Sequence, residues 1–392
     1  MSDPLPLTLR LHRAITEVPR GAWDALLDDA ARPFLEWAFL AALEESGSVG
    51  PHTGWHPRHL TLWQGSRLVA AAPAYLKDDS HGEFVADGAW ATAAERLGVR
   101  YYPKLVLAVP FTPVTGRRLL VAPGEDRAAR EQELARAALE YARAEGFSSV
   151  HVHFPTEAEA TALEAAGYAV RLSVQYQWRN AGYGSFEDFL TRFHTHRRNQ
   201  IRRELRAPAA QGLTLRTLRG EALAEVDPVD LHRLYVSTVD KYPWGRRLLT
   251  PGFFARMLST FRQACELVEV RRDGRLVAGA FNLVGPRVLY GRYWGCFEEH
   301  PFLHFNACLY HPVAEAIARG LERFEPGSGG EHKLTRGFEP QPTWSAHLLF
   351  HPGVDRAVRS FLEHERAAVL AGLPRWRAET GFKRGPFVPP TR

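Results

Sequence analysis

The sequence predicts a mixed α/β protein made of two domains. Its 392 residues suit two domains of roughly 180 residues each. A short hairpin pattern occurs twice, at 59–72 and 267–280, and predicted helices follow strands in both halves. A strand–turn–strand unit repeated half a chain apart is typical of duplicated α/β domains. We therefore expect a first domain at 1–180 and a second at 181–392.

The two hairpins carry the repeat. Each has alternating or apolar strands joined by a glycine turn, which is a hairpin signal. Aligning Leu68 with Leu276 places both hairpins at one offset. The other predicted elements are a helix at 131–145, a strand at 149–154 and a helix at 157–166 in the first half, and a strand at 288–294 and a helix at 307–321 in the second.

Composition narrows the class of protein. Hydrophobic residues make up 45% and charged residues 24%, which supports a substantial core and argues against wholesale disorder. The net charge of +5 and pI near 9.2 are mild for a nucleic-acid binder but suit an anionic ligand. Three cysteines argue for a reducing compartment. The start lacks signal-peptide features and no long apolar run occurs, so we expect a cytoplasmic protein without a membrane span.

The densest group of polar residues follows a glycine-rich turn in the second half. The strand Tyr290-Gly-Arg-Tyr-Trp-Gly-Cys296 mixes aromatic and cationic side chains, and its alternation predicts Tyr290 and Arg292 on one face and Tyr293 on the other. After a helix and a turn with three glycines comes Glu331-His-Lys-Leu-Thr-Arg336. A packed core does not need so many polar side chains, so this segment is the first candidate for chemistry.

Three segments resemble one known family. They are 102–116, 289–296 and 330–338, and they resemble the FemAB-like family, in the branch described as peptidoglycan biosynthesis or recognition proteins. The resemblance runs from about Trp37 to Glu365. It implies two GNAT-like acyltransferase folds in tandem, and transfer of an aminoacyl group from aminoacyl-tRNA to an amine of a cell-wall precursor. Asn306 stands where the pattern of this branch leads us to expect a glutamate.

Acyl transfer to an amine requires a base, a donor for the developing oxyanion and exclusion of water. His332 suits the base, and Lys333 or Arg336 suits the oxyanion or an anionic substrate group. The resemblance implies that the first domain helps form the acceptor cleft, where Asp87 would accept a proton or bind the amine. For each residue the alternative is a structural polar network or, for Asp87, a turn. The predicted catalytic residues are Asp87, Glu331 and His332, and the predicted substrate-binding residues are Tyr102, Lys104, Tyr290, Arg292, Tyr293, His304, Lys333 and Arg336.

A basic helical segment at 193–206 opens the second domain, and we expect Pro208 and Gly212 to end it. Within it, Arg198, Arg202 and Arg206 fall four residues apart and share one face. The functional interpretation is a cationic ridge for the phosphates of tRNA or of a nucleotide-linked sugar. The alternative is an ordinary solvated helix face.

Two further motifs have open interpretations. Arg179-Asn-Ala-Gly-Tyr-Gly184 matches the loop with which GNAT enzymes hold the CoA pyrophosphate, or it is a glycine linker. Cys296, His300, His304 and Cys308 fall four apart, a spacing that invites zinc, but one continuous helix would spread them over about 18 Å. We therefore expect buried cysteines, no metal and no tightly bound cofactor.

The sequence thus favours an N-acyl or aminoacyl transferase. Aminoacyl-tRNA is the leading donor and acyl-CoA the second, with an amine-bearing acceptor such as a peptidoglycan precursor. One alternative is an acetyl-CoA-dependent N-acetyltransferase acting on a small molecule or peptide. Another is a non-catalytic protein that binds a cell-wall precursor or peptide and does not depend on His332 or Asp87. The donor, the acceptor and the oligomeric state stay open.

Overall fold

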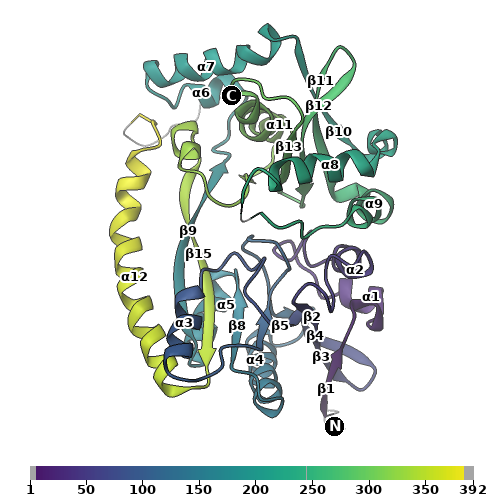
Figure 1. The fold of residues 1–392 in the computed structure, drawn as a ribbon, viewed down its shortest axis with the longest axis vertical. Helices are drawn as coiled ribbons and strands as arrows, with labels where there is room; N and C mark the ends of the chain where they lie inside the picture. Colours follow the sequence, from purple (N-terminus) through teal and green to yellow (C-terminus); the bar gives the residue numbers. More distant parts are fainter. Residues whose placement is uncertain (1–5, 244, 384–392) are drawn as a thin grey trace. The chain divides into compact units, whose positions relative to one another are not determined.

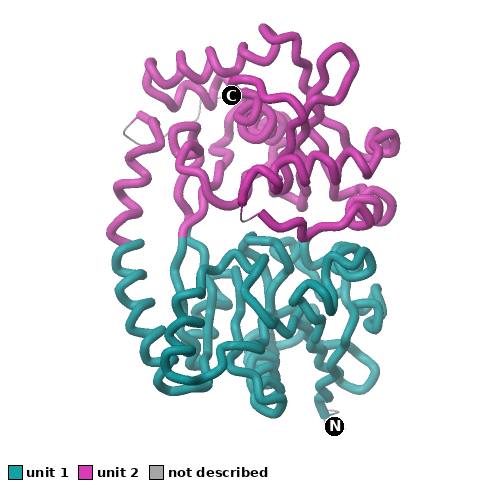
Figure 2. Tube along the Cα trace, in the orientation of Figure 1, with its two compact units in different colours: residues 1–173, 342–369 teal, residues 174–341, 370–392 magenta. Residues whose placement is uncertain are grey.

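The computed structural model describes residues 6–243 and 245–383. The chain forms two compact units (Figure 2). Unit 1 contains residues 1–173 and 342–369, and unit 2 contains residues 174–341 and 370–392. The chain first passes from unit 1 to unit 2 after Ser173, close to the boundary expected near residue 180. The return of 342–369 to unit 1 has no counterpart among the sequence expectations.

Unit 1 contains two groups of strands (Figure 1). One is a four-stranded sheet in the order β1-β3-β4-β7, and the other follows the order β15-β8-β6-β5-β2. The strands are β1 (Leu7–His12), β2 (Trp55–Pro57), β3 (His59–Gln64), β4 (Arg67–Ala72), β5 (Ala74–Lys77), β6 (Lys104–Leu107), β7 (Leu120–Val121), β8 (Ser149–His153), the start of β9 (Ala169–Arg179) and most of β15 (Glu339–Leu349). The helices are α1 (Arg20–Asp24), α2 (Trp37–Glu45), α3 (Gly88–Arg96), α4 (Arg127–Ala144), α5 (Glu157–Ala165) and most of α12 (Pro352–Ala378).

Helix α4 forms the centre of the unit 1 core. Its buried Leu134 and Ala138 belong to one apolar cluster with Leu62 of β3 and Val150 of β8. Alternate side chains of a strand point to opposite faces, so the odd-numbered residues of β8 face away from α4. On that other face Trp90 of α3 packs with the first turns of α12. The polar residues of β8 therefore lie beneath α3.

The structure contains both predicted hairpins, one in each unit. β3 and β4 form the first, and β11 and β12 of unit 2 form the second. Aligning Leu68 with Leu276 brings the two pairing registers into coincidence. Each hairpin leaves one residue unpaired directly after its aligned leucine, Val69 in the first and Val277 in the second. Such a bulge depends on the pairing of both strands, so its recurrence at one position supports a repeated fold.

Unit 2 is built on a run of strands in the order β10-β11-β12-β13-β14-β9 (Figure 1). The strands are β10 (Leu213–Arg219), β11 (Cys265–Arg272), β12 (Arg275–Val284), β13 (Val288–Cys296), β14 (Arg323–Glu325) and the end of β9. The helices are α6 (Phe186–Leu190), α7 (Thr195–Ala210), α8 (Pro228–Val239), α9 (Pro251–Thr260), α10 (Leu303–Phe305), the π-helical segment η4 (Asn306–Tyr310), α11 (His311–Ala318), the 3-10 helix η5 (Glu331–Arg336) and the end of α12.

Gly295 of β13 allows a helix to approach closely. A Cβ atom on Gly295 would lie 1.9 Å from the backbone oxygen of Leu234 in α8, so no larger residue fits. On the other face of the sheet, Leu289 of β13 packs with Val313 of α11 and Ile201 of α7. Gly295 of the Tyr290–Cys296 motif thus serves helix packing, whereas Gly291 lies against the backbone of Pro326.

The expected alternation in this motif is wrong. A bulge in the pairing of β12 with β13 leaves Arg292 without a partner residue on β12. Tyr290 pairs with Leu283 and Tyr293 with Phe281, and these two β12 residues lie on one face. Tyr290 and Tyr293 therefore share a face, because the extra residue shifts the period by one.

Of the two residues expected to end the basic helix, Gly212 is confirmed, because α7 ends at Ala210 and Gly212 has a positive φ, whereas Pro208 is wrong. Pro208 lies inside the last turn of α7, which continues to Ala210. A proline has no N–H to donate to the carbonyl four residues earlier, which here belongs to Glu204. The side-chain amide of Asn306 donates to that carbonyl at 2.9 Å instead. The substitute donor satisfies the carbonyl, so the helix accommodates the proline.

None of the helices in the described parts of the chain is both long and apolar enough to cross a membrane.

Candidate functional site

Unit 1 holds a buried ionic network around Lys104, the first residue of β6. Its ammonium donates to Glu83 Oε2 at 2.9 Å, to Asp87 Oδ2 at 2.5 Å and to Ser80 Oγ at 2.9 Å. The Tyr102 hydroxyl lies 2.8 Å from the same Ser80 oxygen. Lys104, Glu83 and Asp87 are each at most 3% exposed. The structure therefore brings together three residues predicted separately, Asp87, Tyr102 and Lys104, and adds Glu83.

The two carboxylates of this network differ in their protonation. Burial pushes the pKa of Asp87 upward, but the charge and hydrogen bond of Lys104 outweigh it and leave the pKa below its usual value. Burial raises the pKa of Glu83 to about 7, because Lys104 offsets only part of the effect. A base is most effective when its pKa lies near the working pH. Glu83, rather than the predicted Asp87, is therefore the carboxylate poised to exchange a proton.

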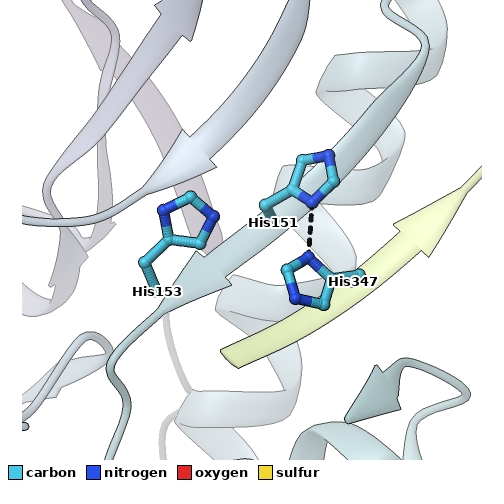
Figure 3. A group of neighbouring side chains, drawn as sticks. All are labelled: His151, His153 and His347. Atoms are coloured by element: carbon cyan, nitrogen blue, oxygen red, sulfur yellow. Dashed lines mark hydrogen bonds between the residues drawn. The ribbon is translucent and has the colours of Figure 1, made fainter. Parts of the chain in front are cut away.

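Beside this network lie three histidines that the sequence analysis did not select (Figure 3). His151 and His153 come from β8 and His347 from β15, and each is at most 1% exposed. Burial lowers the pKa of all three, that of His347 to about 3. The sequence does hold a signal, because Ser-x-His occurs once in each strand, at 149–151 and 345–347.

In unit 2, a buried salt bridge organises the segment after the glycine-rich turn. Arg336 of η5 donates through Nη2 to both carboxylate oxygens of Glu204 in α7, each at 3.0 Å. Tyr310 donates its hydroxyl to the same carboxylate, and the Arg336 guanidinium lies 3.5 Å from the Phe305 ring centroid. Both charged groups are buried. The guanidinium is thus already paired, and its role here is to hold η5 against α7.

Lys333 differs from Arg336 because it forms no ion pair with any described residue. Its ammonium donates to the backbone oxygens of Gly327 at 2.8 Å and Ser328 at 3.4 Å. Burial lowers its pKa to about 8. The glycine turn has positive φ at Gly327 and at two later glycines, which aims its carbonyls at this amine. Lys333 is therefore a buried amine close to its titration point at neutral pH.

Two histidines stand next to Lys333. The rings of His304 and His332 have centroids 5.8 Å apart, and His304 also meets Trp294 edge to face. Burial, together with the charges of neighbouring cations, lowers the pKa of His304 to about 4 and that of His332 more modestly. His332 lies at the surface and folds back over Gly330, where a Cβ atom would be 2.7 Å from its ring. Both imidazoles are uncharged at neutral pH, so each can accept a proton.

The remaining predicted residues of unit 2 make their contacts outside the group of His304, His332 and Lys333. Tyr290 is buried beside Glu325 and Arg323, and burial raises its pKa above the usual value. Tyr293 packs in an aromatic cluster that includes Phe281 and Phe254. The Arg292 guanidinium lies 5.4 Å from the Tyr293 ring centroid. Glu331 is exposed at the start of η5.

The arginines of the basic helix α7 differ in exposure and in their side-chain partners. Arg202 pairs with Glu187 at 2.6 Å, and both side chains are largely exposed. Arg206 is exposed and has no side-chain partner among the described residues, and Arg198 is half-buried with none. Glu204 belongs to the buried face of the helix, so it does not neutralise the arginine face. A cationic surface therefore persists on α7.

The glycine motif that matches a CoA loop already uses its backbone donors. The side-chain oxygen of Asn180 accepts from the N–H groups of Gly182 and Tyr183, each at 3.1 Å. The Arg179 guanidinium donates to Gln341. Backbone N–H groups that hold a pyrophosphate must be free to point at it. This loop therefore offers no ready phosphate cradle.

The cysteines and histidines spaced four apart do not gather. His300 contacts Gln211 and Glu298, and His304 packs against Trp294. The expectation of buried cysteines holds for Cys265 but is wrong for Cys296 and Cys308, which are half-buried. Desolvation raises the pKa of the Cys308 thiol above its usual value. Among the residues with described positions, the group with metal-ligand geometry is instead His151, His153 and His347.

Comparisons with solved structures describe the fold. FemX superposes with a TM-score of 0.51 at 13% identity, over 91% of this chain and all of FemX. The C-terminal domain of a protein assigned as a lysylphosphatidylglycerol synthetase from Agrobacterium fabrum superposes with a TM-score of 0.51 at 11% identity, over 88% and 95% of the two chains. A tandem GNAT protein from the clavulanic acid pathway gives 0.45 at 15% identity, over 88% and 99%. The first two of these structures confirm the predicted mixed α/β fold, and at these identities the likeness concerns the fold alone.

The family comparison covers nearly the whole chain. A search of curated proteins found no match. The model of the FemAB-like family, described as peptidoglycan biosynthesis/recognition, matches residues 14–384, slightly more than the resemblance seen in the sequence. The chain belongs to the FemAB-like family of peptidoglycan biosynthesis and recognition proteins.

Proposed function

We propose that this protein is an N-acyl or aminoacyl transferase that acts on an amine of a peptidoglycan precursor. The observation that carries the proposal is the group formed by His304, His332 and Lys333 in a FemAB-like chain. It combines two uncharged imidazoles with a buried amine that has no carboxylate partner among the described residues. Those are the parts that proton removal and oxyanion stabilisation require.

The chemistry follows from the protonation states. An imidazole, His332 at the surface, takes the proton that the attacking amine loses as its nitrogen bonds to the acyl carbon. The ammonium of Lys333 donates to the carbonyl oxygen as negative charge develops there. The bond from the acyl carbon to the donor's oxygen or sulfur then breaks, and the imidazole returns the proton to the leaving group. Arg336 does not take part directly, because Glu204 binds its guanidinium.

We infer that the donor is aminoacyl-tRNA rather than acyl-CoA. The exposed arginine face of α7, with Arg206 unpaired among the described residues, suits a partner with many phosphates. The loop that would hold the CoA pyrophosphate has its N–H groups at Gly182 and Tyr183 bound to Asn180. These two observations favour the tRNA donor over the CoA donor.

One observation favours recognition without turnover as the second candidate function. Asn306 replaces the glutamate that the family pattern leads us to expect, and its amide is used to hold the backbone oxygens of Glu204 and Phe302. A structural amide at this position supplies no acid or base. A protein of this kind would bind the precursor and release it unchanged.

The test is a transfer assay with radiolabelled aminoacyl-tRNA, and separately acetyl-CoA, supplied with a peptidoglycan-precursor amine. His332→Ala should lower turnover while leaving the unfolding midpoint unchanged, because His332 is exposed. The matched control is His364→Ala, an exposed histidine on α12. If His332→Ala keeps full activity per folded molecule, the proposed base is wrong. If the protein binds the precursor but transfers no group from either donor, the transferase proposal is wrong and recognition without turnover takes its place.

The donor is tested by the dependence of binding on salt. Each phosphate contact adds about one unit to the slope of log K against log salt, so Arg206→Gln should flatten the slope for tRNA by roughly one. Arg356→Gln, an exposed arginine on α12, is the control and should leave the slope unchanged. If the two variants give equal slopes of log K against log salt, Arg206 on α7 does not contact the tRNA.

A further inference from the structure

The three buried histidines of unit 1 form a group with an unusual arrangement (Figure 3). His151 and His347 lie directly opposite one another on the antiparallel strands β8 and β15, and His153 follows two residues later on the same face. One ring nitrogen from each histidine lies within 4.8 Å of the others. Strand pairing, rather than a loop, sets this convergence.

Two serines orient two of the rings. Ser149 Oγ lies 2.8 Å from Nε2 of His151, and Ser345 Oγ lies 2.8 Å from Nε2 of His347. The Nδ1 atoms of these two histidines then face each other at 2.6 Å. When both serines accept from an Nε2–H group, both Nδ1 atoms present bare lone pairs, which repel unless a proton or a cation lies between them. A hydrogen bond that fixes the outer nitrogen in this way orients a histidine and prepares its other nitrogen to bind a metal.

A proton shared between the Nδ1 atoms of His151 and His347 would explain their close approach, but it would leave His153 without a partner. Neither nitrogen of His153 has a hydrogen-bond partner in the part of the chain that the structure describes, although the residue is buried. Buried polar groups are nearly always paired, so an orphaned imidazole aimed at two others needs an explanation. A metal ion supplies it, since it takes the lone pair of each ring.

The charges around the group permit a cation. Most cations whose charges reach the histidines are paired, since Glu83 and Asp87 both bind Lys104, Glu365 binds Arg171 and Asp79 binds Lys77. Arg118 also acts on His153, and its guanidinium donates to backbone oxygens. Glu83 Oε2 lies 3.8 Å from Nε2 of His153, and Glu83 Oε1 has no partner among the described residues. Glu83 therefore brings a carboxylate next to His153, outside the group of three converging rings.

We propose that unit 1 binds one divalent transition-metal ion, zinc above all, through His151, His153 and His347, with water in the fourth position. Three histidines with one further oxygen ligand form a recognised set for tetrahedral zinc. With Zn–N bonds near 2.05 Å, the two Nδ1 atoms move apart from 2.6 Å to about 3.3 Å. Two rings rotating on neighbouring strands accommodate that change. The site is independent of the transferase proposal, which uses residues of unit 2.

The experiment uses the full chain without a histidine tag. Metal content is measured by mass spectrometry after purification, and the chelator-treated protein is then titrated with Co²⁺ and followed by its visible absorption. We expect one ion per chain and the intense bands of tetrahedral cobalt. Zinc should also raise the unfolding temperature of the chelator-treated protein, because it binds only the folded state.

Variants distinguish this site from adventitious binding. His153→Gln should abolish the cobalt bands and the zinc-dependent rise in Tm, and it removes no hydrogen bond. The matched control is His12→Gln, a buried histidine of unit 1 bound to Thr61, which should keep both. The double variant Ser149→Ala and Ser345→Ala keeps all three ligands, and should weaken binding by roughly 10- to 100-fold. No bound metal, or equal binding by His153→Gln and the unaltered chain, would overturn the proposal.

Discussion

Replacing Glu204 by Gln tests how unit 2 holds its candidate site. The carboxylate receives three N–H contacts from Arg336, one hydroxyl from Tyr310 and one amide from Gln200. The change removes the negative charge and leaves the Arg336 guanidinium, 7% exposed, without its counter-charge. Breaking a buried ion pair by removing one partner costs about 3–5 kcal/mol. Since the glutamine oxygen still accepts part of the hydrogen bonding, we expect a loss near 3 kcal/mol.

The assay is urea unfolding followed by circular dichroism, supported by calorimetry. For a unit of this size the loss corresponds to a fall in Tm of roughly 10 °C. The matched control is Glu187→Gln, which breaks the exposed pair with Arg202 on the same helix and should cost about 0–1 kcal/mol. If both variants lose less than about 1 kcal/mol, the buried pair does not hold η5 and the reasoning is refuted. A second check is Glu204→Leu combined with Arg336→Met, which should recover much of the loss.

Three further predictions follow from burial and close packing. Burial holds the pKa of Glu83 at about 7 in the folded protein, so its contribution to stability should fall as pH rises from about 4.5 to 7. Buried histidines such as His304 and His347 act in the opposite direction over this range, so the measurement is the difference in unfolding free energy between the chelator-treated unaltered chain and Glu83→Gln, which should fall as pH rises. Gly295→Ala should destabilise unit 2 by about 3 kcal/mol through overlap with α8, whereas Gly21→Ala, where nothing lies near the new methyl group, should be neutral in the same unfolding assay. Transfer should decline as pH rises through about 8, because Lys333 then loses its proton, and a pH profile of Lys333→Arg should lack that decline.

Local features of the fold were predictable from the sequence because they depend on neighbouring residues. The hairpins, with glycine turns and alternation, appeared where expected, as did the helix at 157–166, which begins at a Thr156 capping box. The bulge at Arg292 was not predictable, because it is defined by pairing with β12. The position of Pro208 inside α7 was missed for a similar reason. It depends on an amide from Asn306, about a hundred residues further along the chain.

For the candidate site, the sequence indicated which residues to consider but not which side chains contact one another. Composition around the glycine turn marked Lys333, His332 and Arg336, and these do lie near one another. Their chemistry depends on a distant residue, since Glu204 neutralises Arg336 and leaves Lys333 as a cation with no counter-charge within residues 6–243 and 245–383. The Ser-x-His pairs were overlooked because each alone looks like an ordinary strand. Only strand pairing places His151 opposite His347.

The charge balance of the two polar groups indicates what each is suited to bind. In unit 2, Arg336 is neutralised and the neighbouring histidines are uncharged, so Lys333 gives the group a positive potential that favours an anion or an oxyanion. In unit 1, by contrast, Glu83 and Asp87 both bind Lys104, and the three uncharged histidines offer lone pairs to a cation. Loss of the Lys333 charge should therefore impair transfer while leaving metal binding by the histidines of unit 1 intact.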